Sequence, residues 1–336
     1  MYFRSLIPPK RGISLVEMVV ILAIIAVLAG VLFVSILHTR AASRSLACSN
    51  NLRQVGAAMA SYESTYRVFP PACDLKGFSL QVSLLPLLER ADAYASFRAF
   101  SYDNEGSIEE MRKLPRSHGL SVYRCPDSAI GPFRREASTA DDDPINSVLG
   151  KSELDFTSYL ACFGSKTALP DIEYAGICSI LPLRPRTRVA EVRNGLSQTL
   201  AVCEGAGFDL ARLENILDEQ FTGYAKGIVY QTAKRYHDPD ELANDCWHGV
   251  GTTAVPKVVG YEWVRAGSDN NFSTWLPPNS RSCLNQRGPR RAPISASSHH
   301  GSFVNACYGD GSVRKIDDSI ESTVWQNMGR ISQQAD

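Results

Sequence analysis

The sequence predicts an α+β fold, in which a long N-terminal α-helix packs on a mainly antiparallel β head domain with long loops. Three observations support this prediction. Met18–Leu37 is an uncharged run of about 20 residues, nearly all apolar, which is long enough for a continuous helix. A polar stretch with apolar residues at helical spacing follows, and Pro70 ends the helical pattern. From Pro71 to Asp336, short strand-like segments alternate with turns.

The composition is that of an ordinary globular protein without a charge bias. The chain has 336 residues, of which 44% are hydrophobic, enough for one large domain or two modest ones. Lys and Arg together number 35, as do Asp and Glu, so we expect no nucleic-acid partner. The nine cysteines contain no C-x-x-C pair, which argues against a zinc ribbon or a redox motif. All nine follow the apolar run, so disulfides are possible if that part lies outside the cytoplasm.

The apolar run has three interpretations: a secretory signal peptide, a plain membrane anchor, or a processed helix that assembles with others. A signal peptide has a shorter apolar core of about 7–15 residues. Glu17 argues against a plain anchor, because a carboxylate near the start of a membrane helix costs roughly 2–3 kcal/mol. If the chain is cut after Gly12, Glu17 becomes the fifth residue and can pair with the new amine on Ile13 of a neighbouring subunit.

This segment resembles the N-terminus of type IV pilins and type II secretion pseudopilins: Lys10-Arg11-Gly12, then Ile13-Ser14-Leu15-Val16-Glu17 and the apolar run. The resemblance implies a pilin-like fold, a prepilin leader at 1–12, cleavage by a prepilin peptidase after Gly12 and N-methylation of Ile13, where Phe is usual. It also implies a transmembrane helix at 13–37 in the bacterial inner membrane. Basic residues flank the run on both sides, so the resemblance alone implies an extracytoplasmic or periplasmic head domain.

The helix continues past the apolar run as an amphipathic stalk. Its stripe has the spacing 3, 4, 3, 4 and consists of Leu52, Val55, Met59, Tyr62 and Tyr66. We therefore expect an extracytoplasmic stalk helix at 38–69, which packs its stripe on a head domain at 70–336.

Several blocks resemble a large bacterial prepilin-like family known as domain of unknown function 1559. They are Cys48-Ser49-Asn50-Asn51-Leu52-Arg53-Gln54-Val55-Gly56, Tyr123–Asp127, Thr157–Ala161 and Val189–Thr199. The resemblance covers nearly the whole chain, but the head domain of that family has no established activity. Cys48 and Cys125 both lie in matching blocks, so the resemblance suggests a disulfide between them.

Within the head domain we expect partial helix at Ser79–Phe100 and loops at Ala137–Gly150 and Pro277–Ser298. Asn194-Gly195 predicts a turn between strands at Val189–Val192 and Thr199–Glu204. The His- and Asp-rich stretch from His237 to His248 could coordinate a metal, but its spacing matches no zinc or calcium loop, so it is interpreted as a solvated loop.

Near the C-terminus, His300 is followed after nine residues by Asp310-Gly311, which is the H-x9-D-G signature of the same family. Strands at Phe303–Tyr308 and Ser312–Ile316 would form a hairpin within 299–316. We expect His300 to hydrogen-bond across it. The alternatives are that His300 and Asp310 bind a metal or form an acid–base pair, or that the hairpin serves processing or recognition. A helix at 317–331, capped by Asp317 or Asp318, would follow, with its stripe at Ile320, Val324, Met328 and Ile331.

The sequence contains no G-x-S-x-G, H-E-x-x-H or P-loop motif, so we expect no catalytic residue, no resident metal and no cofactor. We predict a membrane-anchored, pseudopilin-like structural subunit of a type IV pilus or type II secretion-like assembly. Its expected partners are the lipid bilayer, the prepilin peptidase and other pilin-like subunits. The alternative is an extracytoplasmic module that binds a glycan, a surface component or a secreted cargo. A hydrolase is supported only by the size of the head.

Overall fold

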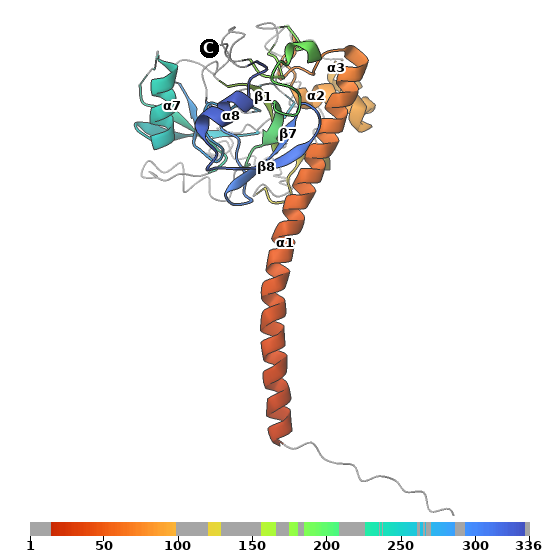
Figure 1. The fold of residues 1–336 in the computed structure, drawn as a ribbon, viewed down its shortest axis with the longest axis vertical. Helices are drawn as coiled ribbons and strands as arrows, with labels where there is room; N and C mark the ends of the chain where they lie inside the picture. Colours follow the sequence, from red (N-terminus) through yellow and green to blue (C-terminus); the bar gives the residue numbers. More distant parts are fainter. Residues whose placement is uncertain are drawn as a thin grey trace, which may run out of the picture. The chain divides into compact units, whose positions relative to one another are not determined.

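The computed structural model describes residues 15–98, 120–128, 156–165, 175–180, 185–207, 226–234, 236, 238–260, 263–264, 266, 270–285 and 293–332. The chain divides into two compact units, residues 1–44 and residues 45–336. Helix α1 (Leu15–Tyr66) belongs partly to each unit (Figure 1). The predicted leader at 1–12 and Ile13 lie outside the described residues.

In the first unit, α1 exposes large apolar side chains in every direction. Consecutive residues from Met18 to Leu22 are each about half exposed, and successive helical positions point to different faces. Val27 and Val31, further along the helix, are also exposed. No helix in the described part of the chain is both long enough and apolar enough to cross a membrane.

In the second unit, the remainder of α1 is an ordinary amphipathic helix packed on a core. Leu52, Val55, Met59 and Tyr62 are buried, as the stripe predicts, but Tyr66 is 56% exposed. The helix ends at Tyr66 rather than at residue 69, because Arg67 adopts a positive φ of 60° before the two prolines. The predicted stalk is therefore one turn too long.

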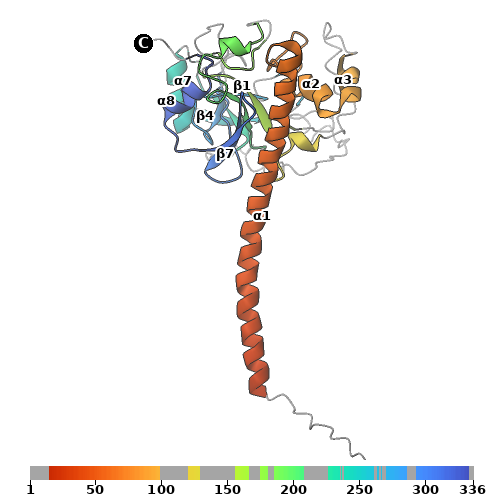
Figure 2. The ribbon, with the colours of Figure 1, turned by 45° about the vertical axis from the view of Figure 1, so that its right-hand side comes forward.

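A five-stranded sheet lies against this part of α1 and has the order β5-β1-β2-β7-β8. Its pairs are antiparallel except β1–β5, which is parallel. Figures 1 and 2 show β1 and β7 beside α1. The strands are β1 (Tyr159–Gly164), β2 (Leu200–Glu204), β5 (Asn271–Ser273), β7 (Phe303–Tyr308) and β8 (Val313–Asp317).

Residues of the sheet enter separate cores on its two faces, alternately along β1 as the period of two in a strand requires, whereas β2 turns the consecutive residues Ala201 and Val202 to one core where its register shifts. Ala161, Ala201 and Val202 join the cluster that contains Leu52 and the rest of the α1 stripe. Leu160, Leu200 and Cys203 join a second cluster, in which Trp325 is fully buried. Strand β2 is buried at every position, which makes it the centre of the head domain.

A smaller sheet has the order β4-β3-β6, with β3 (Ile228–Thr232) antiparallel to β4 (Thr252–Val258) and parallel to β6 (Ser282–Leu284). Strand β6 corrects the prediction of an uninterrupted loop at Pro277–Ser298. Both sheets therefore combine antiparallel with parallel pairs, which fits the predicted α+β class.

Helix α7 (Pro239–His248) corrects the prediction of a solvated loop from His237 to His248. The Asp238 side chain caps it by accepting from the Asp240 amide, and Pro239 occupies its first turn. Gly249 ends it with a φ of 72°. A disulfide from Cys246 joins α7 to Cys283 of β6. His237 itself lies outside the described residues.

Short helices complete the described fold: α2 (Leu80–Leu84), η1 (Leu85–Leu88), α3 (Ala91–Arg98), η2 (Ser121–Tyr123) and η4 (Val189–Glu191). The first three agree with the helix expected in part of Ser79–Phe100. Helix η4 corrects the strand predicted at Val189–Val192, because the Glu191 side chain accepts from the Arg188 amide and closes a helical turn. The loop expected at Ala137–Gly150 lies outside the described residues.

The C-terminal helix α8 (Ser322–Met328) is shorter than predicted and begins after Glu321. Asp317 lies in β8, where its carboxylate accepts from the Ser319 amide in the turn that follows. The buried residue of α8 is Trp325, whose Nε1 donates to the Leu276 carbonyl at 2.8 Å, whereas Val324 is 42% exposed. The predicted stripe was therefore wrong at this position.

Candidate functional site

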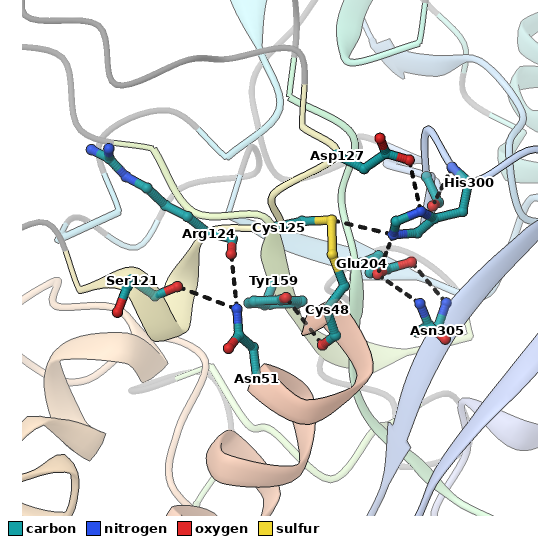
Figure 3. Close-up of a disulfide and its surroundings, with 11 residues drawn as sticks. Cys48, Asn51, Ser121, Arg124, Cys125, Asp127, Tyr159, Glu204, His300 and Asn305 are labelled. Carbon is teal, nitrogen blue, oxygen red and sulfur yellow. Dashed lines mark hydrogen bonds and ion pairs between the residues drawn. A yellow bond between two sulfur atoms is a disulfide. The ribbon is translucent and has the colours of Figure 1, made fainter. Parts of the chain in front are cut away.

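The head domain brings together three side chains that the sequence singles out, Cys48, Cys125 and His300, with the carboxylates of Asp127 and Glu204 (Figure 3). The five residues come from different elements. Cys48 lies in α1, Cys125 and Asp127 follow η2, Glu204 ends β2, and His300 precedes β7. The site thus lies where the stalk part of α1 meets the large sheet.

A disulfide joins Cys48 to Cys125, with the sulfur atoms 2.04 Å apart, and this is the pair that the family resemblance suggests. Neighbouring side chains fix the same junction. Asn51 Nδ2 donates to the carbonyls of Ser121 at 3.2 Å and Arg124 at 2.9 Å, and the Tyr159 hydroxyl donates to the Cys48 carbonyl at 3.1 Å. A disulfide that closes a loop of this kind typically stabilises a fold by about 2–4 kcal/mol.

The His300 ring lies between two carboxylates and against the disulfide. Its Nδ1 is 2.9 Å from Asp127 Oδ2, and its Nε2 is 3.3 Å from Glu204 Oε1 and 3.2 Å from Cys125 Sγ. Its side chain is only 2% exposed, and its ring stacks on Phe303 with the centroids 5.9 Å apart. Burial lowers the pKa of His300, but the hydrogen bond and charge of Glu204, followed by those of Asp127, outweigh it and raise the pKa above its ordinary value.

Glu204 is a buried carboxylate whose position is held by Asn305 on the adjacent strand β7. The backbone amide of Asn305 donates to Glu204 Oε2 at 2.9 Å, and the side-chain Nδ2 of Asn305 donates to Glu204 Oε1 at 2.8 Å. A carboxylate out of contact with water is costly unless charge and hydrogen bonds compensate it. Asn305 and His300 supply that compensation, so Oε1 is held facing the imidazole.

The hairpin of β7 and β8 places Asp310 in a turn. Asp310 Oδ1 accepts from the Ser312 amide at 2.9 Å, and Gly311 takes a φ of 80°. Burial raises the pKa of Asp310, but the Ser312 hydrogen bonds and the Arg314 charge lower it below its ordinary value. The two carboxylates paired with His300, Asp127 and Glu204, lie outside the hairpin. The expected bond across the hairpin is therefore corrected to bonds with Asp127, after η2, and with Glu204 of β2, whereas Asp310 accepts a hydrogen bond within the turn.

Among the other residues predicted to function, Gly12 and Ile13 lie outside the described residues. Glu17 lies in the first turn of α1 and is exposed among the apolar side chains of the first unit.

Two models of known protein families match this chain. The model described as "Protein of unknown function (DUF1559)" matches residues 38–323. The chain belongs to the DUF1559 family. The model described as "Prokaryotic N-terminal methylation motif" matches residues 8–33, which marks the chain as a type IV pilin-like or pseudopilin-like protein. No curated protein and no solved structure matches the chain.

For this DUF1559 chain, sequence reasoning missed Asp127 and Glu204 as the partners of His300. A signal for Glu204 was present, because it ends the run Leu-Ala-Val-Cys-Glu, in which every residue is buried. A carboxylate in such a strand needs a buried partner. Asp127 follows Cys125 by two residues, so the predicted Cys48–Cys125 disulfide would also bring Asp127 close to the residues around Cys48. Neither clue identifies His300, which is far away in the sequence.

Proposed function

We propose that this chain is a structural subunit of a type IV pilus or type II secretion-like assembly, processed by the prepilin peptidase and anchored in the bacterial inner membrane. Its head domain would lie outside the cytoplasm. The observation that carries the proposal is the exposed apolar surface of α1, which begins directly after the leader motif and contains Glu17.

The exposed surface demands an apolar environment. Burying a large aliphatic side chain is worth about 1.5–3 kcal/mol, and a dozen such side chains are exposed between Leu15 and Val31. Their sum exceeds the total stability of a typical domain, about 5–15 kcal/mol. Lipid tails or the apolar helices of neighbouring subunits would each provide that environment, and a pilin-like subunit uses the first before assembly and the second after it.

Glu17 favours assembly over simple anchoring. A carboxylate in the hydrocarbon region of a bilayer costs a few kcal/mol, which an anchor would avoid with an apolar residue. Cleavage after Gly12 would create an ammonium group on Ile13 of each chain. When Glu17 of one subunit meets the ammonium of the next, the cost is offset, and the pair fixes the axial register.

The stalk part of α1 would couple the assembly to the head domain. The Cys48–Cys125 disulfide and the hydrogen bonds of Asn51 hold this part of the helix to the segment around η2. Its stripe is buried in the head-domain core. A displacement of this part of the helix would therefore also displace the core residues that pack against it.

The test is the N-terminal sequence and mass of the chain produced together with an active prepilin peptidase. We expect the mature chain to begin at Ile13, with an added methyl group, and we expect Gly12→Val to keep the leader. Gly30→Ala serves as the matched control, since nothing lies within 4 Å of the position its Cβ would take. A wild-type chain that still begins at Met1 beside an active peptidase would contradict the proposal.

A further inference from the structure

We infer that reduction of the Cys48–Cys125 disulfide converts this junction into a tetrahedral zinc site, with Cys48, Cys125, Glu204 and His300 as its four ligands. The inference is independent of the proposed assembly function. Near the C-terminal signature the sequence alone offered His300 and Asp310 as possible ligands, which are too few for a closed site, whereas the fold supplies a different set of four around His300.

The ligand atoms are already close to the spacing that zinc requires. One donor atom from each of the four residues lies within 4.8 Å of all the others. In a tetrahedral site with Zn–N and Zn–O near 2.0 Å and Zn–S near 2.3 Å, neighbouring ligand atoms lie about 3.3–3.8 Å apart. His300 Nε2 lies 3.3 Å from Glu204 Oε1 and 3.2 Å from Cys125 Sγ. The two bonded sulfur atoms must separate, which is what reduction permits, and the remaining pairs of ligand atoms need only adjust from separations of at most 4.8 Å.

The residues around the ligands are those that orient a metal site. A histidine that binds zinc usually donates its second ring nitrogen to a carboxylate, which fixes the ring and its tautomer. His300 Nδ1 faces Asp127 Oδ2 at 2.9 Å, which leaves Nε2 directed at the proposed centre. Asn305 similarly holds Glu204 with two hydrogen bonds. Both supports come from residues that are not ligands themselves.

The donor set selects zinc over the common hard cations. Two thiolates, one imidazole and one carboxylate suit a borderline-soft ion, whereas Mg²⁺ and Ca²⁺ prefer sets made of oxygen alone. Cys48 is fully buried, Glu204 is 2% exposed and the His300 side chain is 2% exposed. Four protein ligands in a buried position describe a closed, structural site.

The conversion balances with an external dithiol as the reductant. The dithiol gives two electrons and two protons to the Cys48–Cys125 bond, becomes a disulfide itself and leaves two thiols on the chain. Zinc then binds the two thiolates and displaces their two protons to solvent, together with any proton on His300 Nε2. The metal thus holds together α1, the segment after η2, β2 and β7 when the Cys48–Cys125 disulfide is absent.

The experiment uses the full chain in detergent, either oxidised or reduced with a phosphine, which takes an oxygen atom from water and becomes a phosphine oxide while the two protons of that water go to the sulfur atoms. Each form is exposed to Zn²⁺ and then freed of excess metal. We expect about one firmly bound zinc ion in the reduced chain and none in the oxidised chain. Co²⁺ in place of Zn²⁺ should give the intense visible bands of a tetrahedral site and a thiolate charge-transfer band. Asp127→Asn should weaken zinc affinity by about 10–100-fold, the effect expected for a positioning residue.

The matched controls separate this site from the other cysteines. The double variant C48S/C125S should lose zinc binding, whereas C246S/C283S, which lacks the other disulfide, should retain it. Equal binding in the oxidised chain or in C48S/C125S would overturn the inference, because groups other than the Cys48 and Cys125 thiolates would then hold the zinc. The free thiols that could do so are those of Cys73, Cys162, Cys178, Cys203 and Cys307. An octahedral Co²⁺ spectrum would also overturn it. So would a reduced chain that loses its near-UV circular dichroism and does not regain it with Zn²⁺.

Discussion

His300 shows how much the head domain depends on a single side chain that is far from its partners in sequence. The imidazole pairs with Asp127 from the η2 segment and with Glu204 from β2, and it stacks on Phe303 at the start of β7. Lys226 lies nearby and donates to the carbonyls of Ser298 and Gly301 on either side of it. The protonated ring therefore compensates two carboxylates, one of which is buried.

The raised pKa of His300 predicts that the oxidised chain loses stability as the pH rises. A group whose folded pKa exceeds its unfolded value, here about 6.5, contributes its full stabilisation below that value. The contribution is lost as the pH rises through the folded pKa. Urea unfolding of the oxidised chain between pH 6 and pH 9, with a chelator present, should show a falling midpoint.

His300→Gln provides the control for this prediction. The variant keeps a polar side chain of similar size but cannot carry a charge, so its midpoint should be lower at pH 6 and change less with pH. Lys226, whose pKa burial lowers, contributes equally to both chains. A wild-type slope that His300→Gln reproduces in full would exclude His300 as the titrating group.

At the scale of elements, Gly56 is where α1 approaches the hairpin of β7 and β8 most closely among the glycines of the helix. A Cβ added there would lie 2.8 Å from Cys307 Sγ and 3.1 Å from Gly311 Cα. Gly30, also in α1, has nothing within 4 Å of the corresponding position. Within α1, a side chain added at Gly56 would therefore meet close neighbours, whereas one added at Gly30 would meet none within 4 Å.

Two effects of Gly56→Ala oppose each other, and their sizes decide the sign. Alanine gains about 1 kcal/mol of helix propensity over glycine. Overpacking against a fixed backbone costs about 1–3 kcal/mol, and the Gly311 backbone has no side chain to move aside. We expect a net destabilisation of up to about 2 kcal/mol by urea unfolding, whereas Gly30→Ala should be neutral or slightly stabilising. Equal stability of the two variants would show that the hairpin yields at no cost.

The elements that could be predicted from sequence are those whose determinants are local. Strands β7 and β8 lie almost where the pattern puts them, because Gly309, Asp310 and Gly311 define the turn between them. Strand β6 could not be found in this way, since three residues become a strand only through a parallel partner distant in sequence, β3. Tyr66 and Val324 fit a helical stripe, but their side chains are exposed in the structure.

The residues of the candidate site also fall into those that the sequence predicted and those that it did not. The family-like blocks pointed to Cys48 and Cys125, and the signature pointed to His300. Its carboxylate partners could not be deduced, because β2 and the η2 segment meet His300 only in the folded sheet. Helix α7 was missed for another reason: its cap at Asp238, its Pro239 and its terminal Gly249 were all present, but the cluster of His, Asp and Cys suggested a loop.

At the scale of the whole molecule, the two units bury apolar surface in different ways. Among the described residues of 45–336, hydrophobic clusters lie on either side of the large sheet, so most of the large apolar side chains described there are buried within the unit. The described part of residues 1–44 is a single helix whose large apolar side chains from Leu15 to Val31 are exposed. Within the described residues these side chains stay exposed, and the pairing proposed for Glu17 would distinguish a lipid environment from contact with neighbouring subunits.

Glu17→Ala should leave processing intact and impair assembly. A photo-crosslinking residue at Ile24, which is 55% exposed, would report contacts between chains in cells that contain the peptidase and the assembly machinery. Removing one partner of a buried charge pair costs about 3–5 kcal/mol, so crosslinks between chains should fall by at least tenfold. Glu63→Ala, in the head-packed part of α1, should crosslink like the wild type. If Glu17→Ala also does so, the helix would act only as an anchor, because lipid contacts lose nothing when the carboxylate is removed.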